Sequence, residues 1–325
     1  KFVPTNPPVS TTLDSETLAA PGETLAPQHG TGATAYSRPA DIRWLSVASD
    51  ATALYIDGAI DLPPSSDIDW SKGGYEVALN TCGSPCGSGS LPGLTGIRAP
   101  AGVNFVVRLT EAGPAELLIA DDYNPYREVP VAGIANLTDI ILPRNMSVRY
   151  QPDGKFEDLI VEANRRRYTP DGSLIAAKRY SRSILRFGNF DRAASDYDSL
   201  GEWYYDRANS RIRLRLPWGL LLVLDPSQGF IFNGTDDAAS PVGKTSPTIQ
   251  VSVISFSHGT SPGLDSPAQV VAKSFSNGKI TEGWSMPWPA WSSLDVQMTP
   301  KQSYSILAGE FSKLTGYPVE GTSVH

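Results

Sequence analysis

The seven tryptophans are the side chains of this sequence with the clearest chemical potential. The flat face of an indole stacks on the C–H face of a sugar ring, and its N–H can meet a hydroxyl. Three of them, Trp284, Trp288 and Trp291, lie in one proline-punctuated segment. The prolines favour a loop that fixes the rings at the surface, which predicts sugar binding. The same loop could instead fold over the end of the domain and close it.

A second aromatic group, Trp203 followed by Tyr204 and Tyr205, is expected on a strand. Successive side chains of a strand point to opposite faces of the sheet, so these rings cannot all face the core. We therefore take Trp203 and Tyr204 as further candidates for carbohydrate binding. In contrast, Trp44 and Trp218 lie within apolar strands and are expected in the core.

Four acidic side chains gather in one short stretch, at Asp191, Asp196, Asp198 and Glu202. Calcium takes six to eight oxygen ligands, so this stretch is a candidate calcium site, although it lacks the spacing of an EF-hand loop. The alternative is a turn whose acids pair with nearby arginines such as Arg186. No cofactor is required by any motif, and the sequence has no phosphate-binding glycine loop.

Carboxylates could also act as the general acid and base of sugar hydrolysis, which needs two of them at a defined separation. Sequence proximity does not create that separation, so we assign no catalytic residue. A serine nucleophile has little support, because there is no G-x-S-x-G motif and only His29, His258 and His325 could act as a base. A polysaccharide-degrading enzyme, a glycoside hydrolase or lyase, is the alternative to a non-catalytic protein.

The two cysteines, Cys82 and Cys86, enclose Gly-Ser-Pro, which suits a tight loop and predicts a local disulfide. A reduced pair in a cytosolic loop is the alternative. Sequons for N-glycosylation occur at Asn136, Asn145 and Asn233. The cysteine loop and the sequons together predict a secreted, extracellular glycoprotein.

The overall charge argues against two classes of partner. The formal net charge is -7 and the isoelectric point is near 5.1. Nucleic acids and anionic membranes need clustered basic residues, so neither is expected as a partner. The longest apolar stretch, Leu214–Leu224, contains Arg215 and Pro217 and is much shorter than the ~20 residues of a membrane helix. It is expected to be a buried strand.

Glycine and proline, at 29 and 27 residues, favour many short elements joined by tight turns. Two apolar runs, Ile42–Val47 and Ala53–Ile60, flank a Ser49-Asp50 turn and predict a hairpin. Further runs of this kind follow, whereas helical patterns are rare. The sequence therefore predicts a mostly β protein, an antiparallel, jelly-roll-like β-sandwich with long loops.

The chain divides into three expected parts. Residues 1–40 are rich in Pro, Ser and Thr and predict a linker or extended arm. Residues 41–230 predict the sandwich itself, and residues 231–325 predict a β extension packed on it. In the last part, Thr299 as N-cap, Pro300 and the spacing up to Lys313 predict a short C-terminal helix.

A basic run, Arg165–Arg167, precedes the Pro-Asp-Gly turn at Gly172, and the same turn motif ends at Gly154. Two successive hairpin ends are the simplest explanation. The basic run could contact an acidic glycan. On a strand, however, its members alternate faces, which favours pairing with acids such as Glu162.

The segment Asp41–Asn80, with DIRWLSVASDATALYIDGAIDL followed by YEVALNT, resembles sandwich domains related to family 9 carbohydrate-binding modules. Four later segments resemble tail regions of large secreted proteins in which a glycoside-hydrolase-like barrel comes first: Asn164–Gly172, Ile184–Gly188, Tyr197–Trp203 and Leu214–Ser227. The resemblance implies a non-catalytic accessory role, with a polysaccharide or glycan as ligand and a catalytic domain upstream in the same precursor. A structural bracing role is equally compatible with it.

Overall fold

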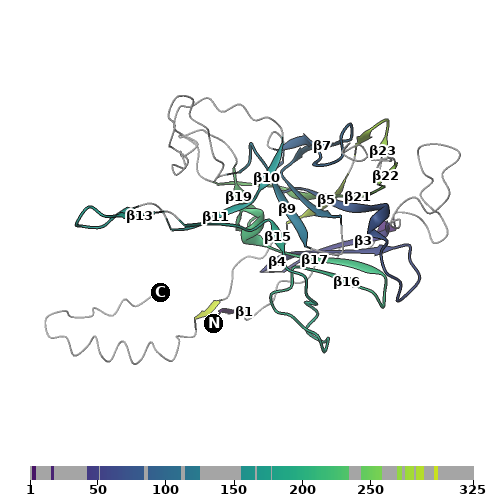
Figure 1. Ribbon diagram of the computed structural model, residues 1–325, viewed down its shortest axis with the longest axis horizontal. Helices are drawn as coiled ribbons and strands as arrows, with labels where there is room; N and C mark the ends of the chain where they lie inside the picture. Colours follow the sequence, from purple (N-terminus) through teal and green to yellow (C-terminus); the bar gives the residue numbers. More distant parts are fainter. Residues whose placement is uncertain are drawn as a thin grey trace.

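The structure is a computed structural model of the chain (Figure 1). It describes residues 2–4, 16–17, 42–50, 52–83, 87–110, 114–124, 155–164, 167–176, 178–233, 243–257, 269–272, 275–281, 283–288 and 296–298. The described part is mostly β, with short 3-10 turns η1 (Trp70–Lys72) and η2 (Trp218–Leu221) as its helical elements. The predicted antiparallel β-sandwich is confirmed. The predicted helix at Thr299–Lys313 lies outside the described residues.

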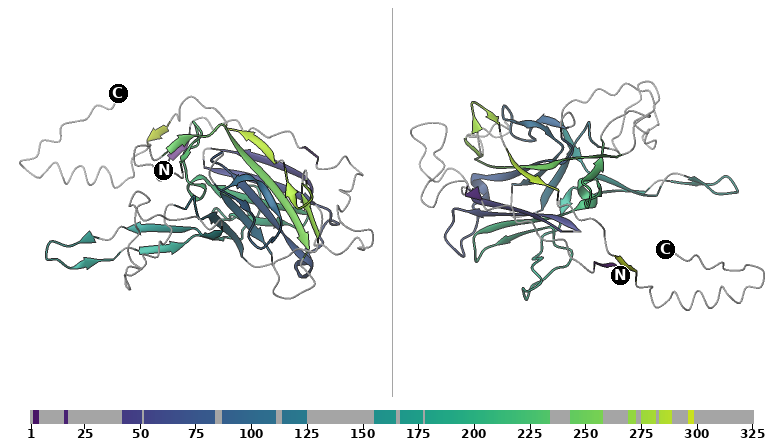
Figure 2. Two further views of the ribbon diagram at one scale, coloured as in Figure 1. Left: turned by 90° about the horizontal axis from the view of Figure 1, so that it is seen from above. Right: turned by 180° about the vertical axis from the view of Figure 1, so that it is seen from behind.

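Two antiparallel sheets form the sandwich (Figure 2). The five-stranded sheet has the order β16 (Trp203–Asp206), β17 (Arg211–Pro217), β4 (Ala53–Ile60), β3 (Ile42–Ser49) and β2 (Glu16–Thr17). The eight-stranded sheet runs β10 (Phe156–Asp158), β9 (Ala115–Ala120), β8 (Phe105–Leu109), β5 (Gly73–Asn80), β21 (Thr248–Ser257) and β22 (Gln269–Ala272). Its remaining strands are β15 (Ile184–Leu185), beside β9, and β25 (Trp284–Pro287), beside β21.

Smaller sheets complete the molecule. A four-stranded sheet contains β23 (Phe275–Ser276), β24 (Lys279–Ile280), β7 (Arg98–Val103) and β6 (Ser88–Ser90). A three-stranded sheet contains β18 (Val223–Asp225), β19 (Phe230–Phe232) and β20 (Gly243–Thr245). Three strand pairs remain: β11 (Ile160–Asn164) with β14 (Lys178–Ser181), β12 (Arg167–Tyr168) with β13 (Leu174–Ile175), and β1 (Phe2–Pro4) with β26 (Val296–Met298).

Segments expected outside the sandwich contribute strands to it. β2 comes from the predicted linker and pairs with β3. β21 comes from the predicted extension and lies between β5 and β22, inside the eight-stranded sheet. The predicted hairpin is present as β3 and β4, and its turn is held by Asp50 Oδ1, which accepts hydrogen bonds from the backbone N–H groups of Thr52 and Ala53.

The main core lies between the two sheets. In β17, Ile212, Leu214 and Leu216 are buried in that core, while the arginines between them are only half-buried. This two-residue alternation is typical of a strand with one buried face and one solvent-exposed face. The outer face of the five-stranded sheet is therefore the polar face of the sandwich.

The eight-stranded sheet, in contrast, is covered on both faces. Every residue of β5 is buried, and the two sides of the strand face different cores. Tyr75 and Val77 belong to the main core, whereas Ala78 belongs to a second core shared with the four-stranded sheet through Val103 and Ile280. The centre of the molecule thus has three layers of strands.

The second face of β5 also holds a buried carboxyl group. Glu76 is fully buried, and its Oε1 accepts a hydrogen bond from Arg108 Nε at 3.1 Å. Arg108 also lies 3.8 Å from Glu116, so the three residues form one row across β5, β8 and β9. Burial raises the pKa of Glu76 to about 8, although the charge of Arg108 opposes the shift.

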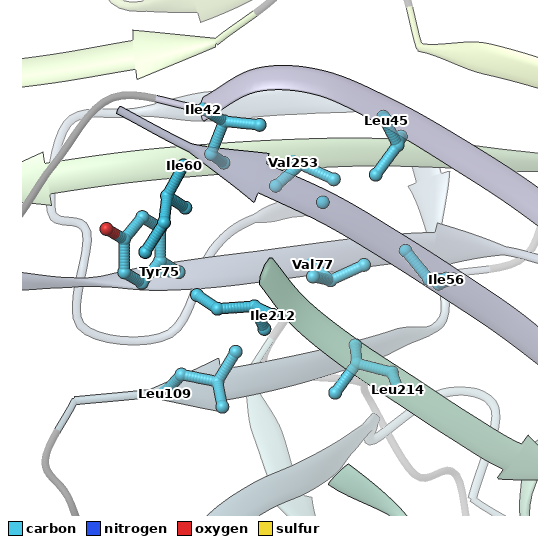
Figure 3. A pocket seen from close by; sticks show the side chains of 11 residues that line it. Ile42, Leu45, Ile56, Ile60, Tyr75, Val77, Leu109, Ile212, Leu214 and Val253 are labelled. Atoms are coloured by element: carbon cyan, nitrogen blue, oxygen red, sulfur yellow. The ribbon is translucent and has the colours of Figure 1, made fainter. Parts of the chain in front are cut away.

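A small cavity lies between the sheets, within the main core (Figure 3). Its walls are aliphatic side chains from both sheets, including Ile60, Val77 and Leu214, and Tyr75 carries the one side-chain hydroxyl of its lining. The volume is about 20 Å³, which is room for a single water-sized molecule. The cavity is therefore a packing void in an apolar core and not a ligand pocket.

Candidate functional site

The polar outer face of the five-stranded sheet brings together several side chains suited to ligand binding. Tyr204 of β16, Arg213 of β17 and Asp57 of β4 stand opposite one another in the strand register, so they form one row on this face. Arg211 and Arg215 flank Arg213 at the alternate positions of β17. We call this surface, with the loop at 186–202 beside it, the outer-face site.

The loop at 186–202 lies along edge strand β16. The backbone N–H of Gly188 donates a hydrogen bond to the Trp203 carbonyl at 3.0 Å, and Phe187 forms a parallel β-bridge with Trp203. Two glycines allow the two halves of the loop to meet, because a Cβ at Gly201 would stand 2.2 Å from the carbonyl oxygen of Gly188. This close approach fixes the position of Phe187 beside Tyr204.

Asp57 occupies the centre of the outer-face site. Its Oδ2 lies 3.4 Å from Arg211 Nη1 and 3.6 Å from Arg213 Nε, and its side chain is only 23% exposed. Burial raises the pKa of Asp57, and the two arginines oppose that shift. Within the described part of the chain, its buried Oδ1 has no hydrogen-bond partner. That oxygen is shielded from solvent, so a ligand can reach Asp57 only through the exposed part of its side chain.

Arg213 links Asp57 to the loop. Its Nη1 lies 3.7 Å from Asp191 Oδ2, and its guanidinium stands 5.3 Å from the centre of the Phe190 ring. Arg215 lies over the same ring at 5.8 Å. A cation over an aromatic face is a favourable contact, so these arginines are held in place by the loop.

An aromatic platform lies at the edge of the site. The rings of Phe187 and Tyr204 are 5.7 Å apart and inclined by 44°, and Phe187 is 55% exposed. Asp196 is a hydrogen-bond partner of Tyr204 and accepts from Asn189 Nδ2 at 2.8 Å. Partial burial, followed by the charge of Asp196, raises the pKa of the Tyr204 hydroxyl. Aromatic rings that are at least partly exposed can stack on the C–H face of a sugar, while neighbouring amide, carboxylate and guanidinium groups bond its hydroxyls.

The predicted tryptophan site requires correction. Trp203 and Trp284 are only 2% and 8% exposed and belong to the main core, so their faces cannot stack on a ligand. Trp284 is buried because its segment forms β25 and pairs with β21 instead of forming a surface loop. Trp288 is half-buried and packs on Trp218, with ring centres 5.5 Å apart. Trp291 lies outside the described residues.

Of the predicted aromatic residues that the structure describes, Tyr204 is the one placed at the outer-face site. The structure adds Phe187, Phe190, Asp57 and Arg213, which were not predicted. The alternating arginines of β17 were visible in the sequence, but the strand pairing that puts Asp57 beside them was not. For Phe187, the glycine that follows it was the available signal of a tight loop.

The four predicted calcium ligands do not converge on one point. Glu202 is buried and bonds Arg182 at 2.5 Å, and Asp198 bonds Arg186 at 2.9 Å. Asp191 and Asp196 are engaged by Arg213 and Asn189, as described above. Over the described ranges, no three His, Cys, Asp or Glu residues form a group that could hold a metal ion. The geometry matches the alternative, acids paired with arginines around a turn.

The residues predicted to mark a secreted protein are only partly described. Cys82 is buried, while Cys86 lies outside the described residues, so their disulfide stays a prediction. Asn233 is also buried, at 6% exposure, which leaves its amide little access for a glycan. Asn136 and Asn145 lie outside the described residues. Among the helical elements described, none has the length and apolar character needed to cross a membrane.

Comparisons with protein-family models, with curated proteins and with solved structures return no match for this chain. The resemblance to carbohydrate-binding modules therefore stays a prediction from sequence motifs, and function has to be argued from the outer-face site.

Proposed function

We propose that this protein is a non-catalytic, secreted β-sandwich that binds a polysaccharide at the outer-face site. The observation that carries the proposal is the pair of neighbouring rings, Phe187 and Tyr204, beside Asp57 and Arg213. The rings would stack on the apolar face of a sugar, and the charged groups would bind its hydroxyls. The Cys82–Cys86 disulfide, glycans at Asn136 and Asn145, and a catalytic domain upstream belong to the same proposal.

Replacing Phe187 with alanine is expected to weaken binding to a neutral polysaccharide by at least about five-fold, because removing a central aromatic contact typically costs more than about 1 kcal/mol. Tyr204→Ala is expected to have a similar effect, whereas Phe187→Tyr keeps a ring and should keep binding. Affinity electrophoresis of the full chain on a panel of neutral polysaccharides measures these changes.

The matched control is Leu224→Ala, which removes an exposed apolar side chain of β18, outside the outer-face site. It should leave retardation in the gel unchanged. Equal retardation of the wild type and Phe187→Ala on every polysaccharide that binds would exclude the outer-face site as the sugar platform.

A second candidate function, polysaccharide hydrolysis, is favoured by one observation. Asp57 has a raised pKa, as a general acid requires, and Asp191 approaches the same arginine. If this alternative holds, the chain releases reducing ends from a polysaccharide, and Asp57→Asn lowers the rate by about 10²-fold or more. Asp67→Asn, which changes an exposed acid elsewhere, is the control. The proposed binding role instead predicts no release by the wild type.

A further inference from the structure

A narrow β-hairpin projects from the sandwich. In its described residues, 160–164, 167–176 and 178–182, β11 pairs with β14 near the body and β12 pairs with β13 at the tip. Both Figure 1 and Figure 2 show it extending well beyond the sheets. We call it the arm. Each of its strands pairs, within the described part of the chain, only with its partner in the same hairpin.

The base of the arm is fixed to the sandwich. Leu159 is buried in the main core, its carbonyl accepts from the Arg182 N–H at 2.7 Å, and its N–H donates to Ser183 Oγ at 2.7 Å. The Arg182 side chain bonds the buried Glu202. The tip is closed by the Pro-Asp-Gly turn, in which Asp171 accepts hydrogen bonds from Thr169 and Ser173. The arm is therefore a hairpin that is anchored to the sandwich at its base and closed by a hydrogen-bonded turn at its tip.

The charge of the arm is opposite to that of the rest of the chain. It contains six basic and two acidic residues, a net charge of +4, whereas the whole chain has -7 and the remainder therefore -11. The basic residues in this stretch of sequence are Arg165, Arg166, Arg167, Lys178, Arg179 and Arg182. Of these, the structure describes the side chains of Arg167, Lys178 and Arg182, and Arg182 pairs with Glu202. The arm would attract an anionic polymer, whereas the net negative charge of the remaining chain would oppose its approach.

Exposed rings accompany the positive charge. Tyr168 is 65% exposed and Tyr180 is 55% exposed, and each stands opposite an aliphatic residue, Leu174 and Val161, in the strand register. Arg167 and Lys178 are exposed as well. Basic groups that neutralise an anionic chain, next to rings that stack on its units, are the features with which proteins hold charged polymers along an extended element.

We propose that the arm binds an anionic polysaccharide, at a second site separate from the outer-face site. The inference rests on the proposed function in that the partner is a polysaccharide, but it uses different residues. Because the contact is largely electrostatic, the affinity should fall steeply with salt, by roughly 30-fold between 50 and 200 mM if three or four charges of the polymer are neutralised.

The test measures binding of the full chain to polygalacturonate, which carries carboxylates, to dextran sulfate, and to neutral dextran. Arg167→Glu is expected to weaken binding to an anionic polymer by about ten-fold or more, and Lys279→Glu, the same charge change on β24, should have little effect. Binding of polygalacturonate and dextran sulfate alike indicates recognition of charge. Binding of one alone identifies the anionic group recognised. Either result supports the arm if Arg167→Glu weakens it.

Three results would overturn the inference. The first is an equal loss of affinity for the anionic polymers in Arg167→Glu and Lys279→Glu. The second is binding of DNA as tight as that of the anionic polysaccharides. The third is self-association of the chain that Arg167→Glu abolishes, because a second copy of the chain would then be the partner. Phe187→Ala separates the two proposals. It should leave anionic binding intact, and Arg167→Glu should leave neutral-polysaccharide binding intact, so each site can fail alone.

Discussion

The free energy of unfolding is expected to fall as the pH rises from about 4.5 to about 8, and Glu76→Gln is expected to remove most of that fall. Burial raises the pKa of Glu76 from its usual 4.5 to about 8 in the folded protein. Between these values the unfolded chain has lost the proton that the folded chain keeps, so a higher pH favours unfolding. Below about 4.5 both states are protonated, and the full stability is present.

The size of this effect follows from the shift. A rise in the pKa of Glu76 from 4.5 to about 8 corresponds to a loss of roughly 5 kcal/mol in the free energy of unfolding, which is comparable to the whole stability of many domains. Glutamine keeps the shape and an oxygen that can accept from Arg108, but it cannot ionise. At pH 8 to 9 the variant is therefore expected to be several kcal/mol more stable than the wild type, as measured by urea unfolding at a series of pH values.

Glu116→Gln is the matched control for this experiment. Glu116 lies in the same row and approaches the same arginine, but its side chain is 44% exposed and can reach water. Its replacement should change stability by less than about 1 kcal/mol at any pH. The contributions of other titrating groups, such as Asp57, cancel when the unfolding free energy of the variant is subtracted from that of the wild type at each pH. A Glu76→Gln curve parallel to that of the wild type would show that Glu76 is ionised in the folded protein at neutral pH.

The strands that have one solvent-exposed face are the elements best predicted from the sequence. The β3–β4 hairpin and the alternating β17 follow directly from polar and apolar periodicity. β5 shows no such alternation because both of its faces are buried, and its one charged residue, Glu76, gives no sign of a buried row. That row depends on the pairing of β5 with β8 and of β8 with β9, which one sequence does not reveal.

β25 shows why the predicted surface position of Trp284 was wrong. A segment with two prolines close to its tryptophans has the composition of a loop, and loops lie at the surface. Strand pairing overrides that composition here, because β25 is an edge strand and proline is tolerated at edges. Trp284 then faces the core together with Met286. Long-range pairing with β21, which the local sequence does not encode, decides the exposure of the ring.

As a carbohydrate site, the outer-face site was predicted only through Tyr204. The sequence shows that neighbouring aromatic residues 203 and 204 point to opposite faces, but not which one faces outward. The pairing of Tyr204 with Arg213 decides this, since Arg213 is on the polar face of β17. The position of Phe187 at the site depends on a further contact, the return of the loop to strand β16, which two glycines allow. Each step is a tertiary contact, so the site becomes visible only in the folded chain.

Trp203→Ala is expected to destabilise the protein by about 3–5 kcal/mol, the range for removing a large buried aromatic side chain. Trp203 is almost fully buried. Its ring also packs edge-to-face against the ring of Phe187, with ring centres 4.9 Å apart, and so supports the aromatic platform. Thermal or urea unfolding measures the loss, and the same variant should also disturb sugar binding indirectly through Phe187.

Trp203→Phe separates packing from hydrogen bonding at this position. The buried Trp203 Nε1 has no hydrogen-bond partner within the described ranges, so replacing the indole with a phenyl ring sacrifices packing volume but no hydrogen bond. The cost of Trp203→Phe should therefore be clearly smaller than that of Trp203→Ala, at about 1–2 kcal/mol. If Trp203→Ala unfolds at the same urea concentration as the wild type while losing sugar binding, the ring contacts the ligand directly, and the assignment of Trp203 to the core is wrong.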